Sequence, residues 1–170
     1  KDEADKDYQL AAGISQDVEA DDSILELTRA RLPWLVLALL GGFITVRVLG
    51  LFEGAMAEHG KLFFFTPLIA AMAGNVGVQS SAIIVQGLAN NTLSGSVFKR
   101  LIKEISLSLL NGVILATILF IGGHFLLDLQ FIEGLIVSGA LISVIIIASL
   151  IGTFVPLLLD KFGIDPALAT

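Results

Sequence analysis

The sequence predicts an all-α integral membrane protein whose helices cross the bilayer as a multi-span bundle. Four apolar runs occupy residues 32–57, 62–89, 102–127 and 131–159, and each is long enough to cross a hydrocarbon core of about 30 Å. Hydrophobic residues make up 55% of the 170 residues and charged residues only 15%. A soluble domain of this size has no need of four such runs. No nucleophile, base and orienting group stand at a recognisable spacing, so we expect no enzyme.

The basic residues near the apolar runs predict how the chain is oriented in the cell membrane. Six of them flank one side and only Lys61 flanks the other; the six are Arg29, Arg31, Lys99, Arg100, Lys103 and Lys161. Because Lys and Arg are enriched in cytoplasmic loops, we expect the N-terminus, the loop at 90–103 and the C-terminus to be cytoplasmic.

Residues 1–28 form an acidic cytosolic segment that precedes the transmembrane domain at 29–170. The first 26 residues hold nine carboxylates against two lysines, which argues against a nucleic-acid partner. Gly13 is typical of a helix end, and one of residues 21–23 is expected to cap the next helix. Glu3 and Asp7 are four residues apart, so on a helix they would present two carboxylates to a divalent cation. A plain solvated tail is the alternative.

The first apolar run opens with Pro33 and Trp34, which fit the first turn of a helix and an interfacial anchor. Arg47 lies further in, where we expect it to face protein, water or headgroups rather than lipid tails. Glu53 follows six residues later, so it does not share a helical face with Arg47. Pairing with neighbouring spans and a role in transport both remain open for these two. In the second run, Pro67 is expected to free a carbonyl and bend the helix.

The second run also carries the most polar stretch at membrane depth. Asn75 and Gln79 are four residues apart and therefore share one helical face. Gly74 and Gly77 remove side chains beside Asn75, so that a backbone, an ion or water can approach. These amides and freed carbonyls form a neutral, oxygen-rich surface that suits a hydrated hard cation. Hydrogen bonding between packed spans is the other interpretation.

The third and fourth runs supply fewer polar groups. Asn111 is expected to serve helix packing. His124 and Asp128 are four residues apart near the outer end, where an interfacial pair is a better interpretation than a metal site, since two ligands are too few. The fourth run carries no ionisable residue between Glu133 and Asp160 and is expected to form a wall of the bundle.

Several motifs together resemble one family. The stretch TPLIAAMAGNVGVQSS at 66–81 is similar to the second-span signature of the MgtE family of magnesium channels and transporters, in which a proline precedes GN-x-G-x-Q. Further similarities occur in order along the chain: EADKD at 3–7, RARLPWL at 29–35, GLFEG at 50–54, LLNG at 109–112, and Pro156 followed by GIDPA at 163–167. The resemblance covers nearly the whole chain.

The resemblance implies a homodimer in which each subunit has five transmembrane helices after a cytosolic region with paired CBS domains. The ion path would lie between the subunits, with Asn75 as a pore-lining ligand that touches Mg2+ through its water shell. Glu3 and Asp7 match acidic positions at the end of a connecting (plug) helix, where regulatory Mg2+ would bind and close the pore. Lys6 and Val78 depart from the family pattern, at positions where a carboxylate and a polar residue are often found.

The resemblance also implies features beyond the two ends of the sequence. The chain begins with Lys1, and we expect a portion upstream of it. The family's fifth span carries a midmembrane aspartate, whereas this sequence ends at Thr170, where that span would begin. Asp165 belongs to the preceding loop and is not a substitute. We therefore expect residues 1–170 alone to conduct Mg2+ poorly, because neutral oxygens compensate a dication incompletely.

The function that the sequence favours is gated, Mg2+-selective channel-type uptake down the electrochemical gradient, with Mg2+, a second copy of the chain and the lipid bilayer as partners. Two alternatives stay open. One is a divalent cation exchanger coupled to Na+ or H+, and the other is a membrane scaffold that does not transport. The residues do not distinguish Mg2+ from Mn2+, Co2+ or Ca2+.

Overall fold

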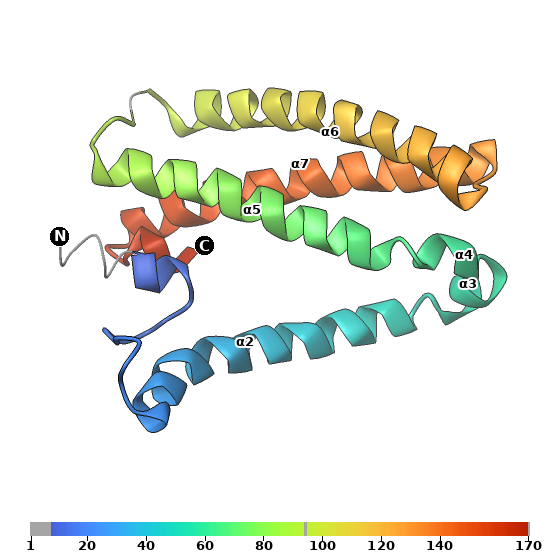
Figure 1. The fold of residues 1–170 in the computed structure, drawn as a ribbon. Helices are drawn as coiled ribbons and strands as arrows, with labels where there is room; N and C mark the ends of the chain where they lie inside the picture. The colour runs from blue at the N-terminus through green and yellow to red at the C-terminus, as the bar shows by residue number, and fades with distance from the viewer. Residues whose placement is uncertain (1–7, 94, 170) are drawn as a thin grey trace. The chain divides into compact units, whose positions relative to one another are not determined.

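The computed structural model describes residues 8–93 and 95–169, and these residues form helices joined by turns and by one longer non-helical stretch at 12–23 (Figure 1). Glu3 and Asp7 lie outside the described residues. Four helices are long and apolar enough to cross a membrane, so the predicted all-α membrane fold is confirmed. The elements are α2 (Ile24–Gly50), α3 (Glu53–Glu58), α4 (Gly60–Phe63), α5 (Thr66–Ala89), α6 (Val97–Leu127), α7 (Phe131–Lys161) and the 3-10 helix η1 (Pro166–Ala169).

The chain divides into two compact units, the first ending at His59 and the second running from Gly60 to Ala169. In the first unit, Ser23 caps α2. Its hydroxyl accepts a hydrogen bond from the Glu26 amide at 3.4 Å, and the Glu26 carboxylate accepts one from the Ser23 amide at 3.1 Å. This reciprocal pair is the capping box that satisfies free amides at a helix start. The expected cap within 21–23 is therefore confirmed.

Pro33 was expected in the first turn of this helix, and that expectation is wrong. The helix begins at Ile24, so Pro33 stands in its interior. Because proline has no amide hydrogen, the carbonyl of Arg29 loses its partner within α2. The cap at Ser23 places the start of the helix ahead of the apolar run, so the expected cap and the expected position of Pro33 do not agree with each other.

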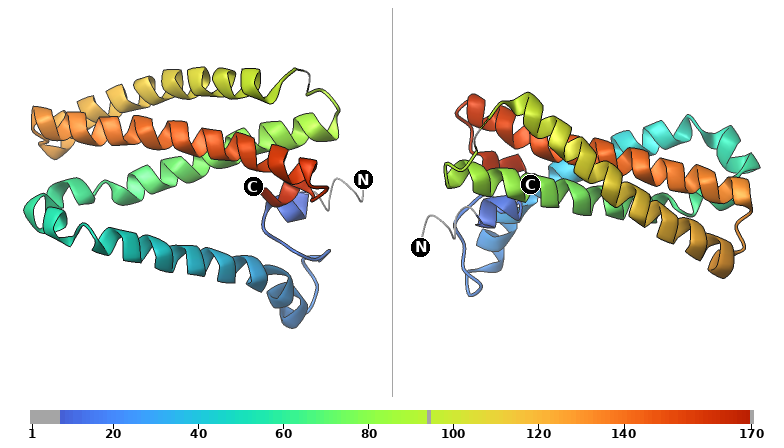
Figure 2. Two further views of the ribbon diagram at one scale, coloured as in Figure 1. Left: turned by 180° about the vertical axis from the view of Figure 1, so that it is seen from behind. Right: turned by 90° about the horizontal axis from the view of Figure 1, so that it is seen from above.

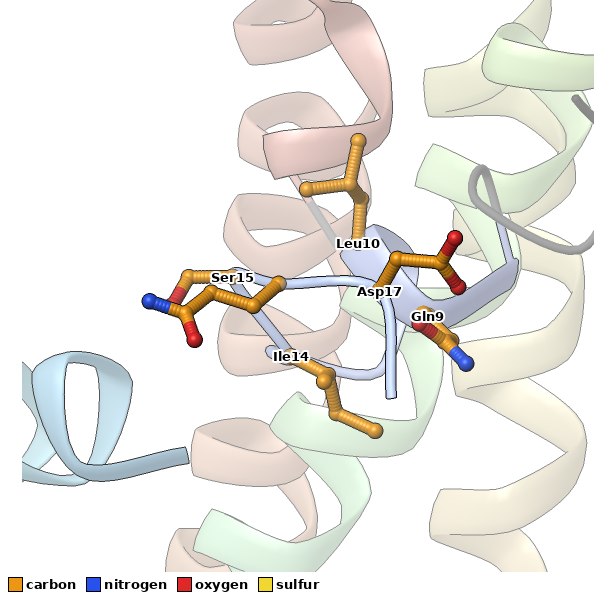
Figure 3. A pocket seen from close by; sticks show the side chains of 6 residues that line it. Gln9, Leu10, Ile14, Ser15 and Asp17 are labelled. Atoms are coloured by element: carbon orange, nitrogen blue, oxygen red, sulfur yellow. The ribbon is translucent and has the colours of Figure 1, made fainter. Parts of the chain in front are cut away.

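The segment before α2 is held by hydrogen bonds to the backbone. Residues 8–11 are helical and Gly13 follows with a φ of 76°, as expected for a helix end. A Cβ at Gly13 would run into the ring of Trp34. The amide and the hydroxyl of Ser15 both donate to the Ala30 carbonyl at 2.9 Å. These contacts leave a cavity of about 280 Å³, whose lining (Figure 3) is Gln9, Leu10, Ile14, Ser15, Gln16 and Asp17.

The second unit is a bundle of α5, α6 and α7 in which α7 contacts both of the others. Figures 1 and 2 show α5 and α7 running in the same direction and α6 running against them. Small residues allow the close approach. A Cβ added to Gly152 would collide with the backbone carbonyl of Gly77, and one added to Gly112 would contact Ile142 at 3.5 Å. Small residues at such contacts are typical of helix packing in membranes.

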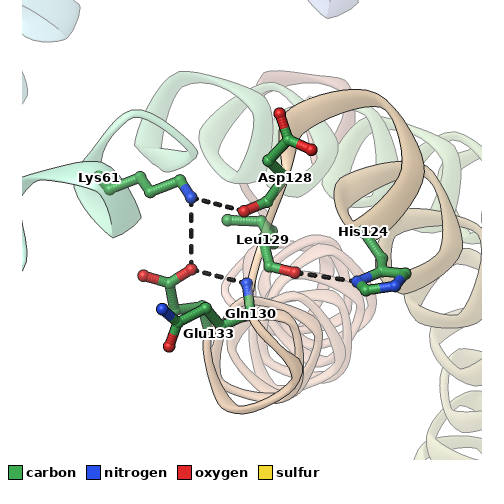
Figure 4. Close-up of polar contacts among 6 residues, drawn as sticks. All are labelled: Lys61, His124, Asp128, Leu129, Gln130 and Glu133. Carbon is green, nitrogen blue, oxygen red and sulfur yellow. Dashed lines mark hydrogen bonds and ion pairs between the residues drawn. The ribbon is translucent and has the colours of Figure 1, made fainter.

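A set of polar contacts closes the end of this bundle at the α6–α7 turn (Figure 4). Lys61 Nζ donates to the Asp128 carbonyl at 2.7 Å and pairs with the Glu133 carboxylate at 3.5 Å. His124 Nδ1 lies 3.0 Å from the Leu129 carbonyl. The expected His124–Asp128 pair is not formed in the described residues. His124 Nδ1 lies against the Leu129 carbonyl instead, and Asp128 ends α6 in the left-handed conformation with its backbone carbonyl bonded to Lys61.

Candidate functional site

The exposed face of α5 carries the two amides that the sequence singled out. Asn75 and Gln79 stand one turn apart, and both are exposed on the surface of their unit. Asn75 comes nine residues after the first residue of α5, about 14 Å along a helix of about 36 Å. Within the described residues, neither amide hydrogen-bonds to another part of the chain. The helix therefore presents two amides without a partner among the described residues, near the middle of its length.

The two glycines beside Asn75 have different surroundings. A Cβ at Gly74 would meet nothing within 4 Å, so Gly74 widens the open face next to Asn75. Gly77 faces the other way, because its carbonyl and Cα lie against Gly152 of α7. The sequence predicted that both glycines clear space around Asn75. The structure gives that environment to Gly74 alone, while Gly77 brings α5 and α7 together.

The open face continues along α5 for three turns. Its exposed residues are Ala71, Gly74, Asn75, Val78, Gln79 and Ala82. The opposite face of α5 carries Ser80, Ser81, Ile84 and Gly87, which are buried. The resulting surface combines short side chains with amide oxygens. Such a surface admits water or a hydrated cation more readily than a bulky apolar solute.

Pro67 does not act as the sequence predicted. It stands in the first turn of α5, where its missing amide hydrogen leaves no helical carbonyl unpaired. Instead of bending a continuous span, it fixes the start of α5 after the turn that follows α4. The second run therefore becomes two helices, and the amides lie near the middle of the second one.

Arg47 and Glu53 occupy the end of α2 and the start of α3. Arg47 is in the last turn of α2, where its charge is favoured by the helix dipole. Glu53 is in the first turn of α3, where a carboxylate is favoured for the same reason. Both are exposed, and within the described residues neither forms an ion pair. Arg47 thus lies closer to the end of its span than the predicted boundary at residue 57 implied.

A buried polar group was not predicted from the sequence. Ser80 of α5 donates a hydrogen bond to the Glu104 carboxylate of α6 at 2.6 Å. Ser108, one turn further along α6, hydrogen-bonds to Ser149 of α7. The signal was present in the sequence, because Glu104, Ser108 and Asn111 follow the i, i+4, i+7 spacing of one helical face.

The described residues contain no group of three or more His, Asp or Glu side chains that would hold a metal ion. Within those residues, the polar groups on the open face of α5 are the amides of Asn75 and Gln79.

Comparison with known proteins agrees with this chemistry. The sequence model of the MgtE family, described as a divalent cation transporter, matches residues 66–170. The chain is 33% identical over 174 residues to the magnesium transporter MgtE of Bacillus subtilis, and the match covers 99% of this chain. It is 35% identical over 171 residues to that of Enterococcus faecalis, again with 99% covered. It is 31% identical over 165 residues to that of Thermus thermophilus, with 94% covered. The chain spans 37%, 37% and 35% of the length of these relatives, respectively.

Proposed function

Because the family match covers more than half of the chain, the protein belongs to the MgtE family of divalent cation transporters, and we propose that it forms part of a pathway by which Mg2+ crosses the cell membrane. The family resemblance seen in the sequence is thereby confirmed, and the family comprises transporters rather than enzymes. The ion in the proposal is the one that the relatives' names give.

The observation that carries the proposal is the pair of amides on the open face of α5. Lipid offers no hydrogen-bond partner, and an unsatisfied polar group in hydrocarbon costs several kcal/mol. The amides of Asn75 and Gln79 find no partner within the described residues. They therefore need water, an ion or another chain against this face. A water-filled path along α5 meets that requirement.

The path lies between two copies of the chain in this proposal, with one α5 face from each. Mg2+ keeps several of its waters because it dehydrates reluctantly. Asn75 would therefore bind the ion through its water shell, with Gln79 next along the path. Gly74 provides the room for that shell, since nothing lies within 4 Å of the place where its side chain would be.

The membrane potential is sufficient to drive entry. Moving one charge through 100 mV yields about 2.3 kcal/mol, so a dication gains about 4.6 kcal/mol. The basic residues predict an N-terminus on the cytoplasmic side. In that orientation α5 runs from the outer to the inner face, so that an entering ion would pass Asn75 before Gln79.

Regulation by Mg2+ is proposed for Glu3 and Asp7, which lie outside the described residues. Two carboxylates four residues apart on a helix attract a divalent cation, and binding would close the path when cytosolic Mg2+ is high. The substitutions Glu3→Gln and Asp7→Asn should together leave transport less sensitive to cytosolic Mg2+. Asp17→Asn is the matched control, and an unchanged Mg2+ response in the double variant would overturn the regulatory role.

Transport is tested by Mg2+ flux into proteoliposomes, with each variant introduced into the full protein that carries this sequence. Hydrogen bonds to charged groups contribute about 1.5–3 kcal/mol, so Asn75→Ala should lower the flux roughly tenfold or more. Gln86→Ala removes an exposed amide from the same helix, two turns beyond Gln79, and should have little effect. Dimerisation of both variants is followed by crosslinking.

Each other function predicts a different result. A scaffold loses assembly in Asn75→Ala and shows no Mg2+ flux in the unmodified protein. An exchanger stops when the Na+ or H+ gradient is removed, whereas a channel continues. Equal flux in Asn75→Ala and the unmodified protein would refute the role of the open face.

A further inference from the structure

A second polar region lies where α5, α6 and α7 meet, and it is lined by buried hydroxyls together with the exposed side chains of Gln79 and Asn111. A cavity of about 60 Å³ lies among their side chains. Its polar lining consists of Gln79 and Ser80 from α5 and of Glu104, Ser108 and Asn111 from α6. Only Gln79 also belongs to the open face of α5, so this cavity is a separate environment within a single copy of the chain.

The hydroxyls in this cavity are buried. Ser80 is 5% exposed and Ser108 is 3% exposed. The Ser80 hydroxyl donates to the Glu104 carboxylate at 2.6 Å, and the Ser108 hydroxyl lies 2.7 Å from the Glu104 backbone carbonyl. The α5 hydroxyl of Ser80 thus holds the Glu104 side chain, whereas the Ser108 contact lies within α6. The carboxylate is half-buried and stands about 10 Å into α6, seven residues after its start.

The Glu104 carboxylate has acceptor capacity to spare. An ionised carboxylate offers about four acceptor positions, and Ser80 is its one hydrogen-bond donor among residues 8–93 and 95–169. In the same residues no Lys, Arg or His nitrogen lies within 4.0 Å of it. A charge that is partly withdrawn from water is costly unless it is compensated. The cavity beside it has room for a few water-sized occupants.

We propose that this cavity binds a monovalent cation, Na+, through the Glu104 carboxylate, the Ser80 hydroxyl and the amide oxygens of Gln79 and Asn111. One carboxylate balances a single positive charge. Mg2+ would also have to give up waters that it releases reluctantly. The oxygen donors come from α5 and α6, so binding would hold these helices together.

The proposal concerns binding alone, and it does not rest on Mg2+ transport. Thermal unfolding of the purified full protein in detergent tests it. The midpoint is measured in sodium chloride and in choline chloride at equal ionic strength. A ligand that binds only the folded state stabilises it in a saturable way. We expect Na+ to raise the midpoint by about 5 °C at saturation.

Variants assign the effect to the cavity. Glu104→Gln should abolish the Na+-dependent shift, and Ser80→Ala should reduce it. Asp160→Asn removes an exposed carboxylate from α7 and should keep the full shift. Binding of radioactive 22Na+ to the unmodified protein, competed by unlabelled NaCl, provides a readout that does not depend on how well Glu104→Gln folds.

Three results would overturn the proposal. The first is the same midpoint in sodium and choline chloride together with no saturable 22Na+ binding. The second is a full Na+ shift in Glu104→Gln. The third is a saturable rise of the unfolding midpoint in MgCl2 that is larger than the rise in NaCl and is lost in Glu104→Gln. That result would show that the cavity binds a divalent cation.

Discussion

Replacing Gly152 by alanine tests whether close contact between α5 and α7 holds the bundle together. The added Cβ would lie 3.2 Å from both the Cα and the carbonyl carbon of Gly77, and closer still to its carbonyl oxygen. Those atoms are backbone in the middle of a helix, so they cannot rotate away as a flexible side chain would. The two helices must move apart to accept the methyl group.

The expected magnitude follows from two opposing effects. Alanine is favoured over glycine within a helix by about 1 kcal/mol. Overpacking a tight contact costs about 1–3 kcal/mol. Gly139 lies in the same helix, and a Cβ there would meet nothing within 4 Å. Gly139→Ala should therefore gain the helical preference alone, and Gly152→Ala should be less stable than Gly139→Ala by about 1–3 kcal/mol.

The assay is reversible unfolding of both variants in mixed micelles, with the free energy of unfolding compared at equal detergent composition. Helix content is checked by circular dichroism, because loss of packing should leave α5 and α7 helical. The reasoning is refuted when Gly152→Ala is as stable as Gly139→Ala. That result would mean that α5 and α7 do not meet at Gly77 and Gly152.

Three further substitutions probe single contacts by the same unfolding measurement. Thr153 is fully buried, and its hydroxyl has no hydrogen-bond partner in the described residues, so Thr153→Val should be neutral or stabilising by about 1–3 kcal/mol. Thr117→Val is the control, since the exposed Thr117 hydroxyl already bonds to a backbone carbonyl; a clear loss of stability at Thr153 would contradict the expectation. Ser23→Ala should lower the free energy of unfolding by about 0.5–2 kcal/mol, because the helix cap is lost. Ser23→Asn should keep most of this stability, since Asn also caps helices; an equal loss in both variants would argue against capping. Lys61→Met should lower the free energy of unfolding by no more than about 1 kcal/mol, because the ion pair with Glu133 is partly exposed. The loss should be smaller in high salt, which screens the pair; a larger loss that does not depend on salt would contradict this expectation.

The helical membrane fold was predictable from the sequence because it depends on the length of apolar runs. The helix boundaries were harder, and Pro33 and Pro67 show why. Composition identifies where lipid contact is possible, whereas caps and turns decide where a helix begins. The Ser23 cap moves the start of α2 ahead of Pro33, and the turn after α4 moves the start of α5 to Thr66. Both prolines changed roles as a result.

The candidate site was predictable in part. The i, i+4 spacing places Asn75 and Gln79 on one face, and the structure keeps both exposed. Spacing cannot tell which neighbour a helix meets, so the contact of Gly77 with α7 was not foreseen. The Ser80–Glu104 hydrogen bond joins residues 24 positions apart. Contacts of this kind depend on how α5 and α6 pack, which a single sequence pattern does not reveal.

The polar side chains of the bundle differ in how they can be satisfied, and this difference supports the roles assigned to Asn75 and Gln79. Hydroxyls such as those of Thr117 and Ser143 donate to the carbonyl four residues earlier in their own helix, so they tolerate exposure to lipid. An amide carries two donor hydrogens and an acceptor oxygen, and one backbone carbonyl cannot satisfy all of them. The demand left at Asn75 and Gln79 must be met from outside the helix. Water and a hydrated cation meet it, whereas lipid does not, and the open face of α5, which carries two such amides one turn apart, is therefore the place where we propose that the ion passes.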